Sequence, residues 1–207
     1  MILTPSQTTV RGFLKIFDPT TGEIFVDKDN AIHYENMSIC MANSLCSGPT
    51  SSAQNGFIYS MAFGNGGSAV DPTGVITYLP PNTTGQNADL YNETYYKVVD
   101  NNSAADTDPA NNYITVLHTS GNVYTDIVVT CLLDYGEPAG QQAFDNSTNF
   151  NGEYVFDELG LKCWFGSSTN LLLITHVIFH PVQKSLNRQI QIDYTLRIQT
   201  LTNLSAA

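Results

Sequence analysis

The sequence predicts a mainly β protein, an antiparallel β-sandwich or barrel with one long helix at about residues 30–46. In Arg188–Thr200, apolar residues alternate strictly with polar ones, as in a strand that buries one face. Elsewhere, turn residues separate about seven to nine short segments rich in β-branched and aromatic residues. Only Asn30–Cys46 spaces its apolar residues by three and four, as a helix does.

The N-terminal region combines an unpatterned segment with a predicted hairpin. Residues 1–10 show no period and are expected to form an arm that becomes ordered by docking. Arg11–Phe17 and Glu23–Asp27 are expected to pair as strands. In the turn between them, Pro19 fixes φ and Gly22 supplies a positive φ.

The predicted helix follows this hairpin, with Asp29 or Asn30 as its cap and Gly48-Pro49 at its end. Leu90–Val99 is ambiguous, although its tyrosines favour extended structure. Residues 100–112 and 136–152 have the composition of loops. The remaining segments with strand character are Phe57–Phe63, Val75–Leu79, Tyr113–His118, Val123–Tyr135, Tyr154–Phe165 and Leu171–Phe179.

The two C-terminal segments are expected to be neighbours in a sheet. Leu171–Phe179 is apolar on both faces, as a central strand is, and should pair with Arg188–Thr200 through the connection His180–Asn187. The composition does not change along the chain. Residues 11–200 are therefore predicted to be a single β-rich structural domain, followed by a C-terminal tail at 201–207.

The charge balance excludes several classes of function. Nineteen acidic against 8 basic residues give a net charge of −11, and only 13% of the residues are charged. Such a surface repels phosphate, which argues against direct nucleic-acid binding and against binding to an anionic membrane. The longest apolar run is far shorter than the ~20 residues of a membrane span. The N-terminus lacks the pattern of a signal peptide, so we expect folding in a cytoplasm.

The charges are also segregated along the chain. Residues 71–160 hold 13 acidic and one basic residue, whereas residues 161–207 hold four basic and one acidic residue. A positive part of one copy can stack on the negative part of a neighbour, which favours ordered head-to-tail assembly. The alternative is that the acidic residues serve solubility alone.

The four cysteines, Cys40, Cys46, Cys131 and Cys163, form no Cys-x-x-Cys pair, so a zinc framework is not expected. Cys131 lies among alternating apolar residues, as a small buried hydrophobe does. We expect free thiols in the core, and disulfides in a mature assembly remain the alternative.

The segment Gly64-Asn65-Gly66-Gly67-Ser68-Ala69 matches a dinucleotide-binding fingerprint that follows a strand. The fingerprint requires a helix next, whose N-terminus binds the pyrophosphate. Asp71-Pro72-Thr73-Gly74 forbids that helix. We therefore interpret the glycines as a tight turn with positive φ at Asn65 or Gly66.

Two histidines have a spacing that suits zinc on a helix. His176 and His180 are four residues apart, but their segment is β-branched and ends at Pro181. On a strand they would lie about 13 Å apart, too far to share one ion. Structural roles are expected for both, and equally for His33 and His118.

The loop at 100–112 offers oxygen ligands around Asp106-Thr107-Asp108, but the spacing does not match a calcium-binding loop. We expect a solvated loop, with calcium as the alternative.

The neighbours Asp157-Glu158 should face opposite sides of a strand and so cannot act as an acid–base pair. No nucleophile signature is present, and neither a catalytic residue nor a cofactor is predicted.

Five segments together resemble virion structural proteins of tailed bacteriophages, particularly those with contractile tails. They are Asp27–Met37, Met61–Gly67, Leu90–Lys97, Asp157–Leu161 and Thr175–Val182. The resemblance covers about residues 11–200 and carries over no functional residue. It implies a non-enzymatic component that assembles as a homo-oligomer in the neck, collar or tail region, or alternatively decorates the capsid or belongs to the baseplate. Its partners would be copies of itself and other virion proteins, and it would reside in the virion after folding in the host cytoplasm.

Two further classes remain open. A carbohydrate-binding β-sandwich module would present exposed aromatic rings beside carboxylates and amides. The candidates are Tyr91, Tyr95, Tyr96 and Trp164. The other class is a hydrolase with a site that no known signature reveals.

Overall fold

The computed structural model describes residues 7–46, 55–138 and 153–201. It is mainly β, as predicted. The strands are β1 (Gln7–Phe17), β2 (Ile24–Ile32), β3 (Ile58–Gly64), β4 (Ser68–Val70), β5 (Ile76–Tyr78), β6 (Glu93–Val98), β7 (Tyr113–Leu117), β8 (Tyr124–Leu133), β9 (Glu153–Ser167), β10 (Asn170–Leu173), β11 (Thr175–Ser185) and β12 (Ile190–Leu201). Within the described residues there is one helix, α1 (Tyr34–Cys46).

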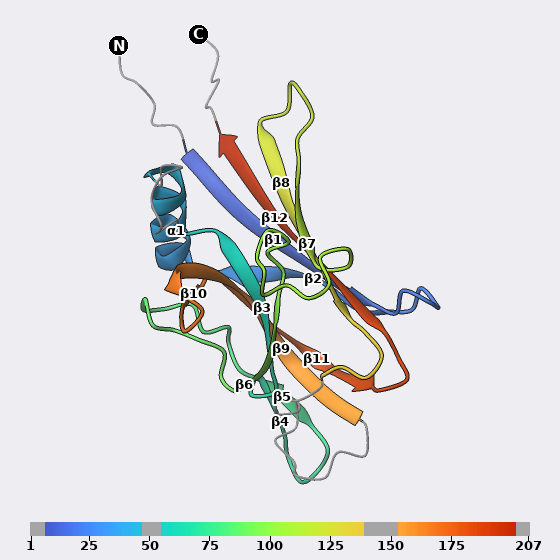
Figure 1. The fold of residues 1–207 in the computed structure, drawn as a ribbon. Helices are drawn as coiled ribbons and strands as arrows, with labels where there is room; N and C mark the ends of the chain where they lie inside the picture. The colour runs from blue at the N-terminus through green and yellow to red at the C-terminus, as the bar shows by residue number, and fades with distance from the viewer. Residues whose placement is uncertain (1–6, 47–54, 139–152, 202–207) are drawn as a thin grey trace, which may run out of the picture.

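One antiparallel sheet forms most of the molecule and curls into a half-barrel, with α1 beside the beginning of β1 (Figure 1). Its strand order is β6-β3-β9-β11-β2-β1-β12-β8-β7, and β10 pairs with β9 outside this path. β4 and β5 form a separate two-stranded ribbon. The prediction of an antiparallel sandwich or barrel is confirmed at this level.

The alternation in β12 determines which face of that strand enters the core. Ile190, Ile192, Tyr194 and Leu196 are buried, while the polar residues between them are half-buried. The buried side chains pack with inward residues of β1, β8, β9 and β11 in one continuous cluster. At about 25 cal/mol per Å² of buried apolar surface, this cluster is the main source of stability.

The predicted neighbour of β12 is wrong. β12 pairs with β1 on one side and β8 on the other. The stretch Leu171–Phe179 is divided at Ile174 between β10 and β11, and β11 continues to Ser185 through the expected connection. β11 pairs with β9 and β2 instead. Alternation specifies the face that a strand buries but not its partner, which here comes from the distant N-terminus.

The helix begins later and is shorter than predicted. β2 extends to Ile32, so residues 30–32 are strand, and α1 has 13 residues. The cap is His33 rather than Asp29 or Asn30: its Nδ1 accepts the backbone N–H of Asn36 at 3.3 Å. This bond satisfies one of the N–H groups that the first turn of a helix leaves free.

Both boundaries of the predicted domain, residues 11 and 200, differ from those of the sheet in the structure. β1 begins at Gln7 and pairs with Leu201 at the end of β12, so residues 7–10 belong to the sheet rather than to an arm. Residues 1–6 and 202–207 lie outside the described residues. The first hairpin is confirmed, with Gly22 at φ 76° in its turn. No helix in the described residues is long and apolar enough to cross a bilayer.

Candidate functional site: a buried polar cluster and an uncharged sheet edge

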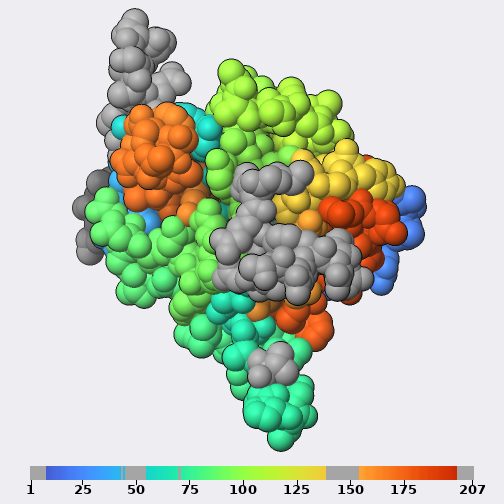
Figure 2. All heavy atoms as spheres, turned by 60° about the horizontal axis from the view of Figure 1, so that its bottom comes forward, coloured from blue at the N-terminus to red at the C-terminus, as the bar shows by residue number. Residues whose placement is uncertain are grey.

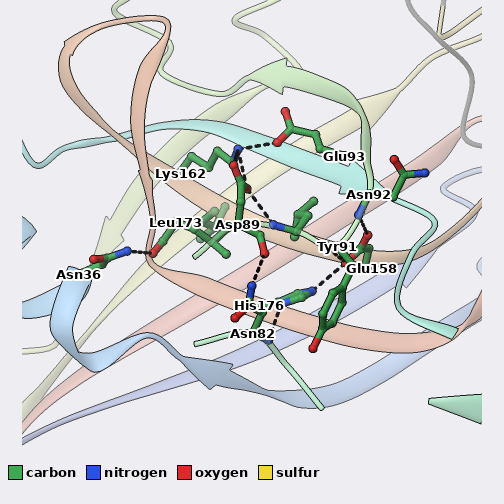
Figure 3. Close-up of polar contacts among 12 residues, drawn as sticks. Asn36, Asn82, Asp89, Tyr91, Asn92, Glu93, Glu158, Lys162, Leu173 and His176 are labelled. Carbon is green, nitrogen blue, oxygen red and sulfur yellow. Dashed lines mark hydrogen bonds and ion pairs between the residues drawn. The ribbon is translucent and has the colours of Figure 1, made fainter. Parts of the chain in front are cut away.

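Glu158 is the centre of a buried polar cluster on β9 (Figure 3). Its Oε1 accepts the backbone N–H groups of Gly66 at 3.0 Å and Asn92 at 2.8 Å. Its Oε2 accepts the N–H of Tyr91 at 2.9 Å and Nε2–H of His176 at 3.0 Å. Burial raises the pKa of Glu158, but these donors outweigh it and hold the pKa below the usual value. The side chain is therefore a carboxylate that joins two loops to the sheet.

Asp157 binds the same turn from the next position of β9. Its two carboxylate oxygens accept the N–H groups of Gly67 at 3.0 Å and Ser68 at 2.8 Å, and also the Ser68 hydroxyl. Burial raises the pKa of Asp157 against the effect of these bonds. The two carboxylates thus bind neighbouring N–H groups of one turn, which their adjacent positions on the strand did not predict. Both are engaged in holding backbone in place.

The glycines of segment 64–69 allow another part of the chain to pack closely on this turn, and they are not arranged to bind a nucleotide. Its N–H groups point at Asp157 and Glu158, so carboxylates of the same chain stand where a phosphate would have to bind. Of the two positions expected to have a positive φ, Asn65 or Gly66, Gly66 does not have it. A Cβ there would lie 2.7 Å from Cβ of Tyr91 and 2.8 Å from N of Asn92. Glycine is required because the segment 91–92 packs directly on this turn.

The two histidines of β11 lie in different environments, and His176 has the structural role that was predicted. His176 is fully buried, and its Nδ1 accepts the N–H of Asn82 at 2.8 Å. Nε2 therefore carries the hydrogen that is donated to Glu158. His180 is exposed and contacts the Tyr78 hydroxyl. Of the other two, His33 caps α1, and His118 is exposed beside Tyr124.

Lys162 forms a second part of the cluster that sequence reasoning missed. Its ammonium group contacts Asp89 at 2.7 Å and also Glu93, while its side chain is only 8% exposed. Burial lowers the pKa of Lys162, but the two carboxylates outweigh it and hold the pKa above the usual value. The available signal was a single charge in the otherwise apolar run 159–165. These ion pairs fix the segment 89–93 against β9.

The four aromatic residues considered for carbohydrate binding lie in different environments. Tyr95 is buried, with its ring 5.9 Å from that of Phe63 in the core. Tyr91 lies over His176, with a ring distance of 5.6 Å, and donates its hydroxyl to Pro80 O. Tyr96 and Trp164 line two shallow hollows that share Ser168.

The acidic loop 100–112 uses most of its carboxylates on its own backbone and amides, although Asp106 Oδ2 is buried without a hydrogen-bond partner among the residues described. Asp100 and Asp106 accept the backbone N–H groups of residues two positions later, and Asp108 accepts the Asn111 amide. Asn112 fastens the loop to β8 by accepting the N–H of Leu132 at 3.0 Å. Neither here nor elsewhere in ranges 7–46, 55–138 and 153–201 does a group of three or more His, Cys, Asp or Glu residues suit a metal ion.

Three of the four cysteines are buried free thiols, as predicted: Cys40, Cys131 and Cys163. Burial raises the pKa of Cys131 to about 12. Cys40 on α1 faces Cys163 on β9, and the neighbouring thiol together with burial raises the pKa of Cys163. The side chain of Cys46 lies outside the described residues.

One edge of the sheet lacks the features that prevent edge pairing. β7 has the sequence Tyr-Ile-Thr-Val-Leu, with neither charge nor proline, and belongs to a hairpin that projects beyond the sheet (Figure 1). Val116 is 64% exposed and Leu117 53%, and Val123, directly before the returning strand β8, is 54% exposed. A flat apolar edge of this kind is a template for another strand.

The opposite edge differs in its chemistry. β6 includes Glu93 and Lys97, and charged residues on an edge strand oppose pairing with another chain. Along β7, Asn101 Oδ1 accepts the N–H of Ile114 at 3.4 Å. In an antiparallel ladder the backbone groups of Val116 point the same way, and they have no strand beside them in the part of the chain that the structure describes. The unpaired stretch is thus centred on Val116.

No family model, curated protein or solved structure matches this chain.

Proposed function

We propose that this chain is a non-enzymatic structural subunit that assembles with copies of itself through the β7 edge. Following the resemblance of its segments, we assign the assembly to the neck, collar or tail region of a tailed-phage virion. Capsid decoration and a baseplate position are the alternatives. The observation that carries the proposal is the projecting edge strand with exposed Val116 and Leu117, because an uncharged apolar edge gains backbone hydrogen bonds and buried surface when a second strand pairs with it.

A structural role agrees with the way the molecule uses its buried ionisable groups. Glu158 and Asp157 bind backbone N–H groups, and Lys162 is held by Asp89 and Glu93. These bonds fasten the loops 65–68 and 80–93 to the sheet. A catalytic acid or base instead needs a proton that it can exchange with a substrate within hydrogen-bond reach.

The segregation of charge along the sequence does not by itself supply a contact between copies. The excess acid lies in residues 71–160 and the excess base in residues 161–207. Of the four basic residues in 161–207, Lys162 and Lys184 are buried, and Arg188 and Arg197 form ion pairs within the chain. Contact between copies would therefore depend on the apolar edge, whose contribution salt does not weaken.

The proposal is tested by replacing one outward residue of the edge. Val116→Lys places a charge on the edge strand, next to the side chains of any strand that pairs with it, whereas Thr119→Lys adds the same charge in the adjoining turn. Analytical ultracentrifugation should show an oligomer for the wild type and Thr119→Lys and a folded monomer for Val116→Lys. A monomeric wild type at about 100 μM, or equal assembly of both variants, would refute the assembly proposal.

The assignment to the neck or tail of a virion is tested separately, on purified phage particles. Antibody labelling of purified tailed-phage particles that encode this chain should mark the neck or tail in electron micrographs. Label on the capsid surface or baseplate would establish an alternative position. Absence of the chain from particles would refute the virion assignment and leave the ultracentrifugation result as an independent finding.

A further inference from the structure

The outer face of strands β6, β3 and β9 has two adjoining hollows. The larger, of about 330 Å³, surrounds the Trp164 ring, and the smaller, of about 150 Å³, lies beside Tyr96 and Lys162. Ser168 lines both, so the hollows form one strip. In Figure 2 the turn between β9 and β10 (orange) adjoins the green segment around residues 80–90, which borders the smaller hollow.

Trp164 is a rigid aromatic surface at one end of the strip. Its ring lies 4.8 Å from that of Tyr59 and nearly parallel to that of Phe57 at 6.2 Å. Tyr59 is buried and supports the indole, which stays half-exposed. Because the ring is already held in place, a ligand that stacks on it loses little side-chain entropy on binding.

Tyr96 supplies a second aromatic surface, with 43% of the residue exposed. It pairs with Ala62, which in turn pairs with Gly160, four residues before Trp164 on β9. With ~3.3 Å per residue and ~4.8 Å between strands, the two Cα atoms lie about 16 Å apart. This span is longer than one sugar ring or one aromatic side chain.

The polar groups between the two rings are mainly hydrogen-bond acceptors. Asp100 lines the larger hollow together with Ser103 and Ser168, and Asp89 and Glu93 line the smaller one. Lys162 uses two of its three N–H donors on these two carboxylates. Three carboxylates against one ammonium leave the strip negative, which disfavours phosphate, sulfate and carboxylate ligands.

We propose that this strip binds a neutral oligosaccharide, with one sugar ring on Trp164 and another beside Tyr96. A pyranose ring has an apolar C–H face, which packs on an aromatic ring, and a rim of hydroxyl groups, which donate to carboxylates. The strip presents both features in a row and exceeds the length of a monosaccharide. This binding site is independent of the β7 edge and of the proposed assembly.

The single tryptophan of the chain makes the test direct, because all tryptophan fluorescence comes from Trp164. The probes are cellohexaose, maltohexaose and chitohexaose, with sialyllactose and oligogalacturonate as acidic comparisons. At least one neutral probe should shift the emission in a saturable way, and the acidic probes should not. Failure of all three neutral probes to shift it, or preference for an acidic probe, would overturn the proposal.

Two aromatic-to-alanine variants test where the oligosaccharide binds. Tyr96→Ala should weaken binding of the neutral probe about tenfold, the equivalent of about 1.4 kcal/mol, as measured by calorimetry. Tyr78→Ala removes an aromatic ring that is 50% exposed on β5 and lines a different hollow, which shares no residue with the strip, so it should leave affinity unchanged. Unchanged affinity in Tyr96→Ala, with far-ultraviolet circular dichroism like that of the wild type, would contradict the assignment. Equal weakening in Tyr78→Ala would contradict it as well.

Discussion

Nε2–H of His176 donates a hydrogen bond to Oε2 of Glu158 at 3.0 Å, and both side chains are completely buried. The bond connects β11 to β9, and through Glu158 it reaches the backbone of Gly66, Tyr91 and Asn92. Strands and loops that are far apart in the sequence are thereby joined at one carboxylate. An amide in its place would lose acceptor capacity where four donors converge.

Glu158→Gln is therefore expected to lower the free energy of unfolding by about 2–4 kcal/mol, since buried N–H groups lose their acceptor. Urea denaturation measures this difference. Asp27→Asn makes the same acid-to-amide change at an exposed position of β2 and should cost no more than about 0.5 kcal/mol. Equal, small effects of the two variants would show that the cluster does not stabilise the fold.

The stabilisation by Glu158 should disappear in acid. Its pKa is lowered in the folded protein, so its contribution is complete above the unfolded carboxyl pKa and is lost as pH falls through the folded value. The difference in stability between wild type and Glu158→Gln should accordingly shrink from about pH 5 downward. A difference that stays constant or grows on acidification would contradict the assigned charge state.

Lys184 should make stability depend on pH in alkali rather than in acid. Burial lowers its pKa to about 8 from 10.5. Between these values the unfolded chain still holds the proton that the folded chain has lost, so stability rises with pH. Lys184→Met should remove this rise and, at pH 7, increase stability by about 1 kcal/mol.

Thermal unfolding at several pH values tests this prediction. Lys15→Met, at an exposed position of β1, is the matched control and should retain the rise between pH 8 and 10.5. A wild type whose stability is flat over that range would show that Lys184 ionises normally.

The two faces of β12 should differ in sensitivity. Leu196→Ala removes a side chain that is 2% exposed and should destabilise by about 2–5 kcal/mol. Thr195→Ala, on the half-buried polar face, should cost about 0.5 kcal/mol in the monomer. Chemical denaturation distinguishes the two, and equal costs would mean that the polar face is also covered.

Local patterns in the sequence predicted which face of a strand is buried and where the chain turns, but not which strands pair with each other. The alternation in 188–200 correctly identified which residues of β12 are buried, because it depends only on the pleat of the strand. It could not identify β1 as the partner, since that pairing joins Gln7 to Leu201 across the whole chain. The helix cap was missed for a similar reason: His33 is positioned by its bond to Gly85 O, which no local pattern reveals.

The same distinction applies to the candidate sites. Sequence reasoning identified His176 as structural and rejected the glycine fingerprint from the Pro72 that follows it. It did not foresee that Asp157 and Glu158 would bind one turn, because that convergence depends on where the chain returns after β3. The exposure of β7 is likewise a property of the strand order.

Hydrogen exchange at the backbone N–H of Val116 tests the assembly proposal most directly. This group lies on the unpaired side of β7, where a strand of a second copy would accept its hydrogen bond. The account predicts slow exchange at concentrations that favour the oligomer and fast exchange after dilution to the monomer. Fast exchange at every concentration, in a sample that ultracentrifugation shows to be assembled, would contradict pairing through β7.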